Sequence, residues 1–513
     1  MRLTLPTLTI APILLENLGV PLTAWHAISK TSPPNPHFLV DNPASITPLV
    51  AVVTPKNPQS AVKASIDRAS EEFESLKITT GPWRSNLLLK WAKEIRENKK
   101  DLAMLMTLEC GKPLAESTGE VEYGASFLDF YSSECLRPNG LNGGTIIPSP
   151  FPKPPSAKNT RGTIMTFNEG VGVCGFITPW NFPLAMITRK VGPALAAGCP
   201  SILKPSELTP LTALALQGLA YKAGVPKAAF EVLALGAEDT PMFGEMICTD
   251  DKVKKISFTG STRVGKILMK QCAEGGIVKK ASMELGGNAP FVVFADADLD
   301  VAVKAAMASK FRNAGQTCVC SDRFLLHEDI EEEFLGLLVK EVEKLRVGDG
   351  AVAGVTMGPL ISLQAREVVE EKVKNAVANG AEILIGGERH EFGERYYKPT
   401  VLRGVSVSDD IFKTETFGPV VASTTFRDDE EALEIIRTTS KTGLASYYCT
   451  QSADRIFNFS RKLEHGMVGV NEGIISSVVA PFGGVGESGI GREGNAAGMR
   501  EYLEEKYVFV NHN

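Results

Sequence analysis

Three features that would assign the sequence to other classes of protein are missing from its 513 residues. No apolar run is as long as the roughly 18–20 residues that a membrane-spanning helix needs, so we expect no membrane partner. Basic residues are not in surplus: 54 Lys and Arg face 60 Asp and Glu, which gives a net charge of -6. Because nucleic-acid-binding proteins are usually basic, we expect no nucleic-acid partner either.

Metal-binding patterns are also missing. The nine cysteines are scattered, and neither a Cys-x2-Cys pair nor a histidine cluster has zinc spacing, so we predict no metal site. An odd number of cysteines in a long chain indicates free thiols and a reducing compartment.

The first residues do not have the pattern of a targeting signal. Residues 1–28 are largely apolar but lack the clean apolar core and small-residue cleavage site of a signal peptide. A mitochondrial transit peptide would be richer in Arg and Ser. We therefore expect a cytoplasmic protein, with the mitochondrion as the alternative.

What the sequence does contain is an alternation of short apolar runs and helical patterns. Its length suggests about three domains at roughly 150 residues each. Amphipathic patterns at 55–76, 83–95 and 102–108 predict packed helices. Strands and helices then alternate twice, which favours two doubly wound, parallel-sheet α/β domains. We expect strands at 171–177, 201–203, 230–235, 255–258, 290–294 and 323–326, and helices at 211–223, 299–312 and 330–345.

A proline-rich stretch interrupts the pattern. The turn Asn142-Gly143-Gly144 is followed by five prolines between positions 148 and 155. Neither a helix nor a central strand tolerates this density of proline, so we expect an arm or linker here. A β-rich stretch follows at 162–168, and a β-prone tail at 507–510.

The first candidate for chemistry is the loop Gly315-Gln316-Thr317-Cys318-Val319-Cys320. Gly315 ends the helix expected before it, so Cys318 lies on a loop where a thiol can be exposed. The thiolate is the reactive form, and a free cysteine titrates near ~8.5, so a nearby base or dipole must assist it. The alternative for these two cysteines is a buried structural role.

Two polar residues have the context of catalytic partners. Glu284 precedes two glycines, and a carboxylate held in a partly apolar cleft can activate water. Asn181 lies between two prolines after a predicted strand, where a rigid backbone can aim its amide as an oxyanion hole requires. Each motif alone also fits a structural turn.

Two further motifs suit a phosphate-bearing cofactor. Lys204-Pro205-Ser206-Glu207 and Gly260-Ser261-Thr262 each follow a predicted strand and open a helix. Helix N-termini bind phosphates through their free backbone N–H groups. Neither motif is the G-x-G-x-x-G fingerprint, so by itself each gives only weak support.

In their order and number these motifs, together with Glu-x-Phe-Gly-Pro at 415–419, resemble those of the aldehyde dehydrogenase superfamily from about Val40 to the C-terminus. Within it, the stretches 186–190, 311–320 and 470–476 resemble the succinate-semialdehyde dehydrogenases. The sequence departs from the family at Gly486-Glu487, where a Lys-Gln pair is usual, and the segment before Asn42 lacks the usual opening strands.

The resemblance implies oxidation of succinate semialdehyde to succinate, as in 4-aminobutyrate degradation, through a thioester on Cys318. Glu284 would activate water and Asn181 would stabilise the oxyanion. NAD would be the preferred cofactor, because Glu207 can accept from the ribose 2′-OH and repels a 2′-phosphate, with NADP as the alternative. The implied substrate-binding residues are Arg189, Arg312 and Ser488, and the implied cofactor-binding residues are Trp180, Lys204, Ser206, Glu207, Gly260, Ser261, Glu415 and Phe417.

Two other functions stay open at this point. A non-catalytic structural relative would keep the fold, but the joint presence of Cys318, Glu284 and Asn181 argues against it. A dehydrogenase for another small aldehyde, such as glutarate semialdehyde or an aminoaldehyde, is the second. An aminoaldehyde enzyme should have carboxylates or aromatic residues where this sequence has arginines.

The family fold also implies a domain layout. We expect an NAD-binding, Rossmann-like domain from residues 1–140 and 170–283 and a catalytic domain from 284–484. A small β arm from 141–169 and 485–513 would join copies into a homo-oligomer, a dimer or a tetramer.

Cys320 carries a last expectation. One residue separates it from Cys318, and Cα atoms at that separation lie about 5.5–7 Å apart, overlapping the range that a disulfide accepts. The resemblance points the same way, since a Cys-x-Cys redox switch occurs in some relatives. We therefore predict a reversible, inactivating disulfide between them, the alternative being that Cys320 only packs beneath the loop.

Overall fold

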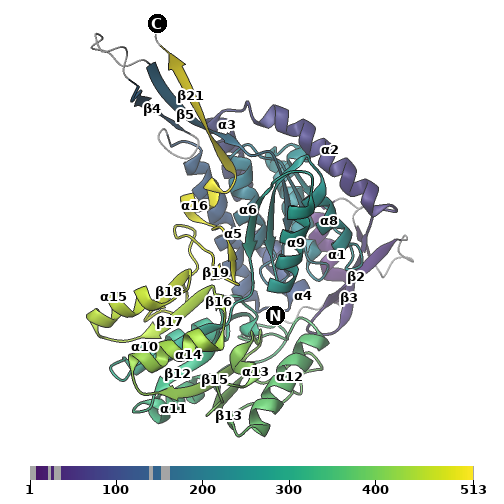
Figure 1. Cartoon of the computed structure of the whole chain (residues 1–513). Coiled ribbons are helices and arrows are strands. Elements are labelled where there is room, and N and C mark those ends of the chain that lie inside the picture. The colour runs from purple at the N-terminus through teal and green to yellow at the C-terminus, as the bar shows by residue number, and fades with distance from the viewer. Residues whose placement is uncertain (1–6, 21–24, 28–35, 138–142, 152–161, 512–513) are drawn as a thin grey trace.

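The molecule consists of two α/β parts, each built on a mainly parallel sheet, and a projecting β arm (Figure 1). The computed structural model describes residues 7–20, 25–27, 36–137, 143–151 and 162–511. The predicted fold class, two doubly wound parallel sheets with a small β arm, is confirmed. Of the described helices, none is long and apolar enough to cross a membrane.

The first sheet has six strands in the order β20-β10-β9-β6-β7-β8. All neighbouring pairs are parallel except β20 with β10. The chain leaves β6 towards β7 and β8 on one side and returns to β9 and β10 on the other, so the strand order reverses between β6 and β9, which is where sheets of this kind bind ligands. The strands are β6 (Val173–Ile177), β7 (Ser201–Lys204), β8 (Phe230–Val232), β9 (Val253–Thr259), β10 (Lys280–Glu284) and β20 (Gly489–Ile490).

Helices cover both faces of this sheet because its strands are apolar on both sides. Buried residues of one helix group form one core cluster, and those of a second group form another with the opposite face. The first group is α3 (Gly81–Glu97), α4 (Lys99–Cys110), α5 (Leu114–Glu134), α6 (Ala185–Ala196) and α7 (Pro210–Ala223), and the second is α2 (Pro58–Leu76), α8 (Thr240–Thr249) and α9 (Thr262–Glu274).

The second sheet has seven strands in the order β13-β14-β15-β12-β11-β17-β18. Only the edge strand β13 is antiparallel to its neighbour. The strands are β11 (Ala289–Val293), β12 (Ser321–His327), β13 (Glu382–Ile385), β14 (Thr400–Arg403), β15 (Val420–Phe426), β17 (Ala445–Cys449) and β18 (Met467–Val470). Its helices are α10 (Leu299–Lys310), α11 (Glu331–Val342), α12 (Leu363–Ala378), α13 (Asp410–Lys413), α14 (Asp429–Thr439) and α15 (Ala453–Lys462).

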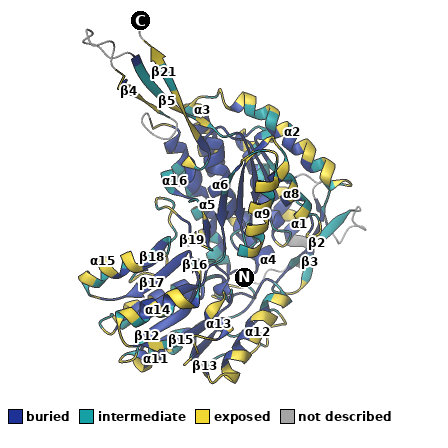
Figure 2. Ribbon diagram, viewed as in Figure 1, coloured by how far each residue is buried: buried dark blue, intermediate teal, exposed yellow. Residues whose placement is uncertain are grey.

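Figure 2 shows both sheets buried between helices whose outer faces are exposed.

The arm is a three-stranded antiparallel sheet in the order β21-β5-β4, and it points away from the rest of the molecule (Figure 1). β4 (Gly144–Pro148) is an exposed edge strand, which is where a sheet tolerates proline. β5 (Gly162–Gly170) and β21 (Leu503–Asn511) form its other two strands. Pro152, Pro154 and Pro155 of the proline-rich stretch lie outside the described residues.

The segment before β21 runs back along the body of the molecule. β19 (Val485–Gly486) pairs with β16 (Thr442–Gly443), β20 extends the first sheet, and α16 (Asn495–Arg500) packs against α5 and α6. The domain boundaries expected from the sequence stay predictions.

One expectation about the N-terminal segment is wrong. β2 (His37–Asn42) pairs antiparallel with β3 (Thr47–Val53), so strands do open this part of the fold. The run from His37 to Asn42 has no clear alternation, and pairing with the apolar β3 makes it a strand. β1 (Trp25–His26) completes that sheet, and α1 (Thr7–Asn17) packs against β3 and α4.

Candidate active site

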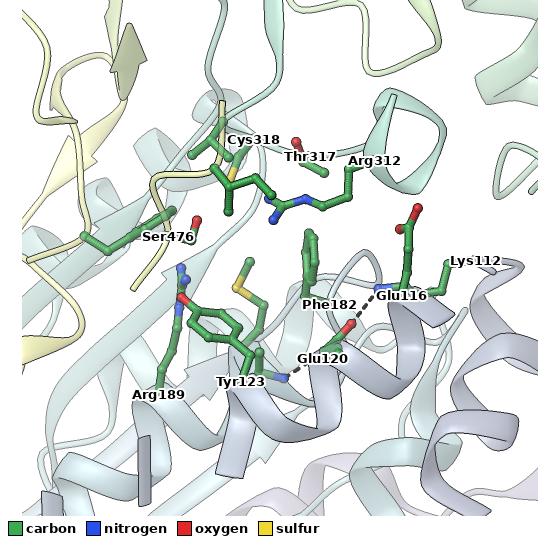
Figure 3. Close-up of a pocket in the computed structure, with 16 residues that line it drawn as sticks. Lys112, Glu116, Glu120, Tyr123, Phe182, Arg189, Arg312, Thr317, Cys318 and Ser476 are labelled. Carbon is green, nitrogen blue, oxygen red and sulfur yellow. Dashed lines mark hydrogen bonds and ion pairs between the residues drawn. The ribbon is translucent and has the colours of Figure 1, made fainter. Parts of the chain in front are cut away.

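A cavity of about 330 Å³ lies where α5 and α6 face the loop that carries Cys318 (Figure 3). Charged side chains enter it from both sides, although most of the wall is apolar. Its lining residues are Lys112, Glu116, Gly119, Glu120, Tyr123, Phe182, Ala185, Met186, Arg189, Arg312, Thr317, Cys318, Val319, Ile474, Ser476 and Phe482.

Backbone geometry brings Cys318 to this cavity. The predicted helix at 299–312 ends earlier, at Lys310, and a short 3-10 turn (Arg312–Gly315) follows with φ of 50° at Asn313, 54° at Ala314 and 76° at Gly315. A Cβ at Gly315 would lie 2.1 Å from the carbonyl oxygen of Gly418, so only glycine fits there. The chain then turns, and the half-buried Cys318 reaches the cavity wall.

The surroundings of Cys318 do not favour its thiolate. Burial raises the pKa of the Cys318 thiol to about 12, and Glu415 and Glu284 act in the same direction. Arg189 and Arg312 oppose this rise in pKa, because a nearby positive charge favours the thiolate. A proton acceptor or a bound positive charge is therefore needed to activate Cys318 near neutral pH.

Asn181 lies beside the same loop. Its side-chain Nδ2 donates to the carbonyl of Gln316 over 3.1 Å, and its backbone carbonyl accepts from Lys112 Nζ over 2.6 Å and from Asn313 Nδ2 over 3.3 Å. A side-chain amide has two donor hydrogens, so one remains for a ligand. The buried amide is thus fixed close to the nucleophile, as an oxyanion hole requires.

Glu284, the last residue of β10, is buried, and its Oε2 has no hydrogen-bond partner among the described residues. Burial raises the pKa of this carboxyl well above its usual range, and the neighbouring Glu493 raises it further. Arg189 and Lys190 partly oppose the rise in pKa. When it is ionised, a carboxyl with a raised pKa is a stronger base than an exposed one and can take a proton from water.

Close backbone contact couples the Glu284 segment to the nucleophile loop. A Cβ at Gly287 would lie 2.1 Å from the carbonyl oxygen of Cys318, so glycine is required for this approach. The Gly287 N–H also donates to Glu415 Oε1 over 3.2 Å. Burial raises the pKa of Glu415 to about 8. The segment that follows Glu284 therefore contacts both Cys318 and Glu415, which keeps the three residues close together.

Two arginines point into the cavity from separate elements (Figure 3). Arg189, on α6, is buried, forms an ion pair with Glu493 and lies 4.2 Å over the ring of Phe482. Arg312 lies 5.3 Å over the ring of Phe182, and its buried Nε has no hydrogen-bond partner among the described residues. Together they make one end of the cavity positive.

The structure does not bring Ser488 to this wall. Its buried Oγ donates to the Gly286 carbonyl over 2.7 Å and accepts from the Gly443 N–H over 2.9 Å. Both hydrogen bonds hold the backbone together and leave the hydroxyl no free donor. Ser476 lines the cavity instead, near Arg189 in Figure 3.

Sequence reasoning missed the contribution of α5. Glu120 is buried and accepts from the backbone N–H groups of Leu184 (2.9 Å) and Ala185 (3.2 Å) and from Lys112 Nζ (2.5 Å), which fixes the start of α6. The Tyr123 hydroxyl is buried without a hydrogen-bond partner among the described residues. Neither residue belongs to a motif, so only the packing of α5 against α6 reveals them.

The groups at the carboxyl ends of β6 and β9 suit a dinucleotide. Gly260 and Ser261 follow β9, and the Ser261 Oγ caps α9 by accepting from the Val264 N–H over 3.4 Å. Trp180 follows β6, and its ring meets that of Phe417 edge-on at 5.6 Å, with Phe417 held at a φ of 51°. The N-terminus of α9 can bind a phosphate through its free backbone N–H groups. The two aromatic rings can pack against a flat ring.

Lys204 is the last residue of β7, and Glu207 follows it at the same edge of the sheet. Lys204 Nζ and Glu207 Oε2 form an ion pair over 2.9 Å. Burial is the main cause that lowers the pKa of Lys204, and Glu207 opposes it. The Ser206 Oγ accepts from the Leu208 N–H over 3.3 Å. These charged and hydroxyl groups can form hydrogen bonds with a ribose at this edge of the sheet.

Cys320 lies beneath the nucleophile loop. It is buried, and its Sγ donates to the Lys310 carbonyl over 3.3 Å. Burial raises the pKa of its thiol to about 12. The disulfide between Cys318 and Cys320 stays a prediction. Within the described ranges, no group of three or more His, Cys, Asp or Glu side chains is arranged to hold a metal ion.

Comparisons with known proteins agree with this arrangement. A model described as the aldehyde dehydrogenase family matches residues 31–508. The mitochondrial succinate-semialdehyde dehydrogenase of Arabidopsis thaliana is 49% identical over 476 residues, covering 92% of this chain and 86% of that protein. The NADP+-dependent succinate-semialdehyde dehydrogenase GabD of Escherichia coli (strain K12) is 44% identical over 471 residues, covering 92% and 94%. The crystal structure of succinate-semialdehyde dehydrogenase from Burkholderia pseudomallei has a TM-score of 0.88 at 43% identity, covering 93% of this chain and 95% of that one.

Proposed function

The chain belongs to the aldehyde dehydrogenase family, and from that premise we propose that it oxidises succinate semialdehyde to succinate with a nicotinamide cofactor. One observation carries the choice of substrate: Arg189 and Arg312 line the same small cavity as Cys318. A guanidinium group matches a carboxylate with two parallel hydrogen bonds and stays charged at every relevant pH. The cavity thus suits an aldehyde with an anionic end.

Covalent catalysis begins at Cys318. Its thiolate attacks the aldehyde carbon, and a C–S bond forms as the carbonyl π electrons move to oxygen. The Asn181 amide and the Cys318 backbone N–H donate to this oxyanion. The substrate carboxylate lies between Arg189 and Arg312, with the Ser476 hydroxyl as a third donor. Carboxylate binding therefore orients the aldehyde towards the sulfur.

The second half of the reaction uses Glu284. A nicotinamide cofactor, when bound, supplies the acceptor for the hydride that leaves the former aldehyde carbon, and a thioester on Cys318 remains. Glu284 takes a proton from water, and the oxygen of that water attacks the thioester carbon. The C–S bond then breaks, which regenerates the Cys318 thiolate and releases the acid, and Glu284 gives its proton to solvent.

We propose NAD as the preferred cofactor and NADP as the alternative. Glu207 offers a carboxylate to a ribose 2′-OH and repels a 2′-phosphate, which favours NAD. Its ion pair with Lys204 reduces this repulsion, so the preference is moderate. The site would hold the cofactor through Trp180, Lys204, Ser206, Glu207, Gly260, Ser261, Glu415 and Phe417.

We propose a homo-oligomer, a dimer or a tetramer, joined through the arm. The arm exposes apolar side chains on both β4 and β21, including Ile146 at 76% and Tyr507 at 56% exposure. Exposed apolar patches of this kind mark protein interfaces. The cytoplasm stays the expected compartment, with the mitochondrion as the alternative.

The proposal is tested with a panel of aldehydes and the Arg312→Ala variant. Wild type should prefer succinate semialdehyde over butanal, which has the same chain length without the carboxylate, and over glutarate semialdehyde. Loss of a buried charge-assisted pair costs about 2–5 kcal/mol, so Arg312→Ala should lower kcat/KM for succinate semialdehyde by about 30-fold or more.

The control is Arg461→Ala, an exposed arginine on α15 outside the cavity. It should leave both rates unchanged. Equal losses on butanal and succinate semialdehyde in Arg312→Ala would mean that Arg312 is structural, and equal wild-type rates on the two aldehydes would contradict the proposed substrate.

A further inference from the structure

A second cavity, here called the outer cavity, adjoins the first. Its volume is about 540 Å³, and α10 and α11 contribute to its wall. The two cavities share Glu116, Arg312 and Ile474, so these residues form the boundary between them. Arg312 therefore faces both spaces.

Positive charge is in excess in the outer cavity, where three cations face two carboxylates. Lys344 is paired with Glu341 over 2.5 Å, and Glu116 accepts from the Asn313 N–H over 2.9 Å. Lys304 is exposed, and neither it nor Arg312 forms an ion pair with any described residue. The outer cavity thus contains two cations that form no ion pair among the described residues, and the Glu116 carboxylate acts on Arg312 through space without contacting it closely enough to pair.

The remaining wall suits a short aliphatic chain. Met307, Ala308, Phe311 and Leu345 give the outer cavity an apolar surface beside the two cations. A molecule with one carboxylate and a few methylene groups matches this combination, because the carboxylate pairs with a cation while the chain covers apolar atoms.

We propose that the outer cavity is a capture site for short aliphatic carboxylates, in which Lys304 and Arg312 bind the substrate anion before it enters the inner cavity. This inference rests on the proposed function. Arg312 keeps its contact with the carboxylate during the transfer, because it borders both cavities. Lys304 acts on the rate of encounter and takes no part in the chemistry.

Steered association of charged partners is faster at low ionic strength and loses this advantage as salt screens the field. Reversing the charge at Lys304 should therefore lower kcat/KM for an anionic aldehyde and leave kcat at saturation unchanged. We expect Lys304→Glu to lose about 3- to 10-fold in kcat/KM for succinate semialdehyde at low salt. Most of the loss should vanish near ~1 M salt, where the Debye length is about 3 Å.

The matched control is Lys90→Glu, which changes the same charge at an exposed position of α3 outside both cavities. It should leave kcat/KM for succinate semialdehyde unchanged. With the uncharged butanal, neither Lys304→Glu nor Lys90→Glu should change kcat/KM. A second measurement is acetylation of Lys304 followed by mass spectrometry, in which succinate should slow labelling of Lys304 but not of Lys90.

Two results separate the failure of this inference from that of the proposed function. If wild type prefers succinate semialdehyde and Lys304→Glu behaves like Lys90→Glu, with no protection of Lys304 by succinate, the capture site is overturned alone. If wild type oxidises butanal as efficiently as succinate semialdehyde, the proposed function fails and the capture site loses its basis with it.

Discussion

At the scale of single residues, Cys318 combines a half-buried position on a loop with surroundings that keep its thiol protonated. Its pKa of about 12 results mainly from burial, and two arginines only partly offset that burial. A protonated thiol reacts with alkylating agents much more slowly than its thiolate does, so the reactivity of Cys318 should depend steeply on pH.

The first prediction concerns the pH dependence of this thiol. The pKa is raised, so the thiolate is disfavoured below pH 12, and its fraction should rise about tenfold per pH unit. In the cofactor-free enzyme, alkylation of Cys318 by iodoacetamide should therefore increase from pH 7 to pH 10 without a plateau. Mass spectrometry of the Cys318 peptide measures the rate separately from the half-buried Cys272.

Arg189→Gln serves as the matched variant. Because Arg189 lowers the pKa of the thiol, its removal should slow the alkylation at every pH in this range. A plateau with a midpoint near pH 8 in the wild-type enzyme would contradict the prediction.

A second prediction distinguishes the two serines. Ser476→Ala should lower kcat/KM for succinate semialdehyde by about 10- to 100-fold, because a hydrogen bond to a charged group is worth about 1.5–3 kcal/mol. Ser488→Ala should instead lower the melting midpoint, since two backbone groups lose their partner. Rates with butanal and thermal unfolding curves of both variants check this. The assignment is reversed if only Ser488→Ala lowers kcat/KM for succinate semialdehyde and this variant keeps the wild-type melting midpoint.

At the scale of elements, α5 contributes more to the site than its sequence suggests. It packs against α3, α4 and α6, and residues around much of its circumference are buried. The ion pair of Glu120 with Lys112 is almost fully buried, at 2% and 1% side-chain exposure. This pair, with the two backbone N–H groups at the start of α6, fixes the wall that carries Arg189.

We therefore predict that Glu120→Ala lowers both stability and substrate affinity. Removing one partner of a buried ion pair costs about 3–5 kcal/mol, because the other charge stays buried alone. The control is Glu122→Ala on the same helix, whose pairs with Arg96 and Lys99 lie at the surface and contribute about 1 kcal/mol or less. Thermal unfolding and KM are measured for both. Similar melting midpoints for the two variants would contradict the role of Glu120.

The sequence predicted most of the elements that carry motifs, for physical reasons that differ from one to the next. β6 ends at Ile177 and β9 at Thr259, and each contains a short stretch of strand-forming residues before a turn, so pattern alone found them. α5 contains Gly, Ser, Thr and Tyr in an irregular apolar pattern, and its tertiary contacts decide its conformation. The positive φ values at Asn313 and Ala314, which end α10 early, depend on contacts with distant segments such as Glu116.

The residues of the candidate site also fall into two groups, those that the sequence predicts and those that only the tertiary structure reveals. Cys318, Glu284 and Asn181 belong to motifs and could be named from the sequence. Ser476 could not, because its place in the cavity depends on how a loop far along the chain returns to α5 and α6. Tertiary contacts of this kind have no local signal.

At the scale of the whole molecule, the arm carries exposed apolar side chains that a single chain leaves uncovered. We predict that wild type sediments as a dimer or tetramer and that the Ile146→Lys/Tyr507→Lys double variant sediments as a smaller species. Both side chains are exposed within one chain, so the substitutions should not alter its fold. Sedimentation velocity measures the change, and circular dichroism checks the fold. A monomeric wild type, or a double variant of unchanged size, would contradict the role of the arm.

The late position of β20 in the chain has a consequence for biosynthesis. β20 closes one edge of the first sheet, and Glu493, just beyond it, is the anion that pairs with Arg189 and Lys190. A ribosome adding roughly 5–20 residues per second needs about 10–40 s to travel from β10 to β20. During that interval the strand edge of β10 is unpaired and two cations destined for the interior have no counter-charge. The nascent first sheet is therefore incomplete until β20 and Glu493 have been synthesised, and this is the interval in which it most needs protection by chaperones.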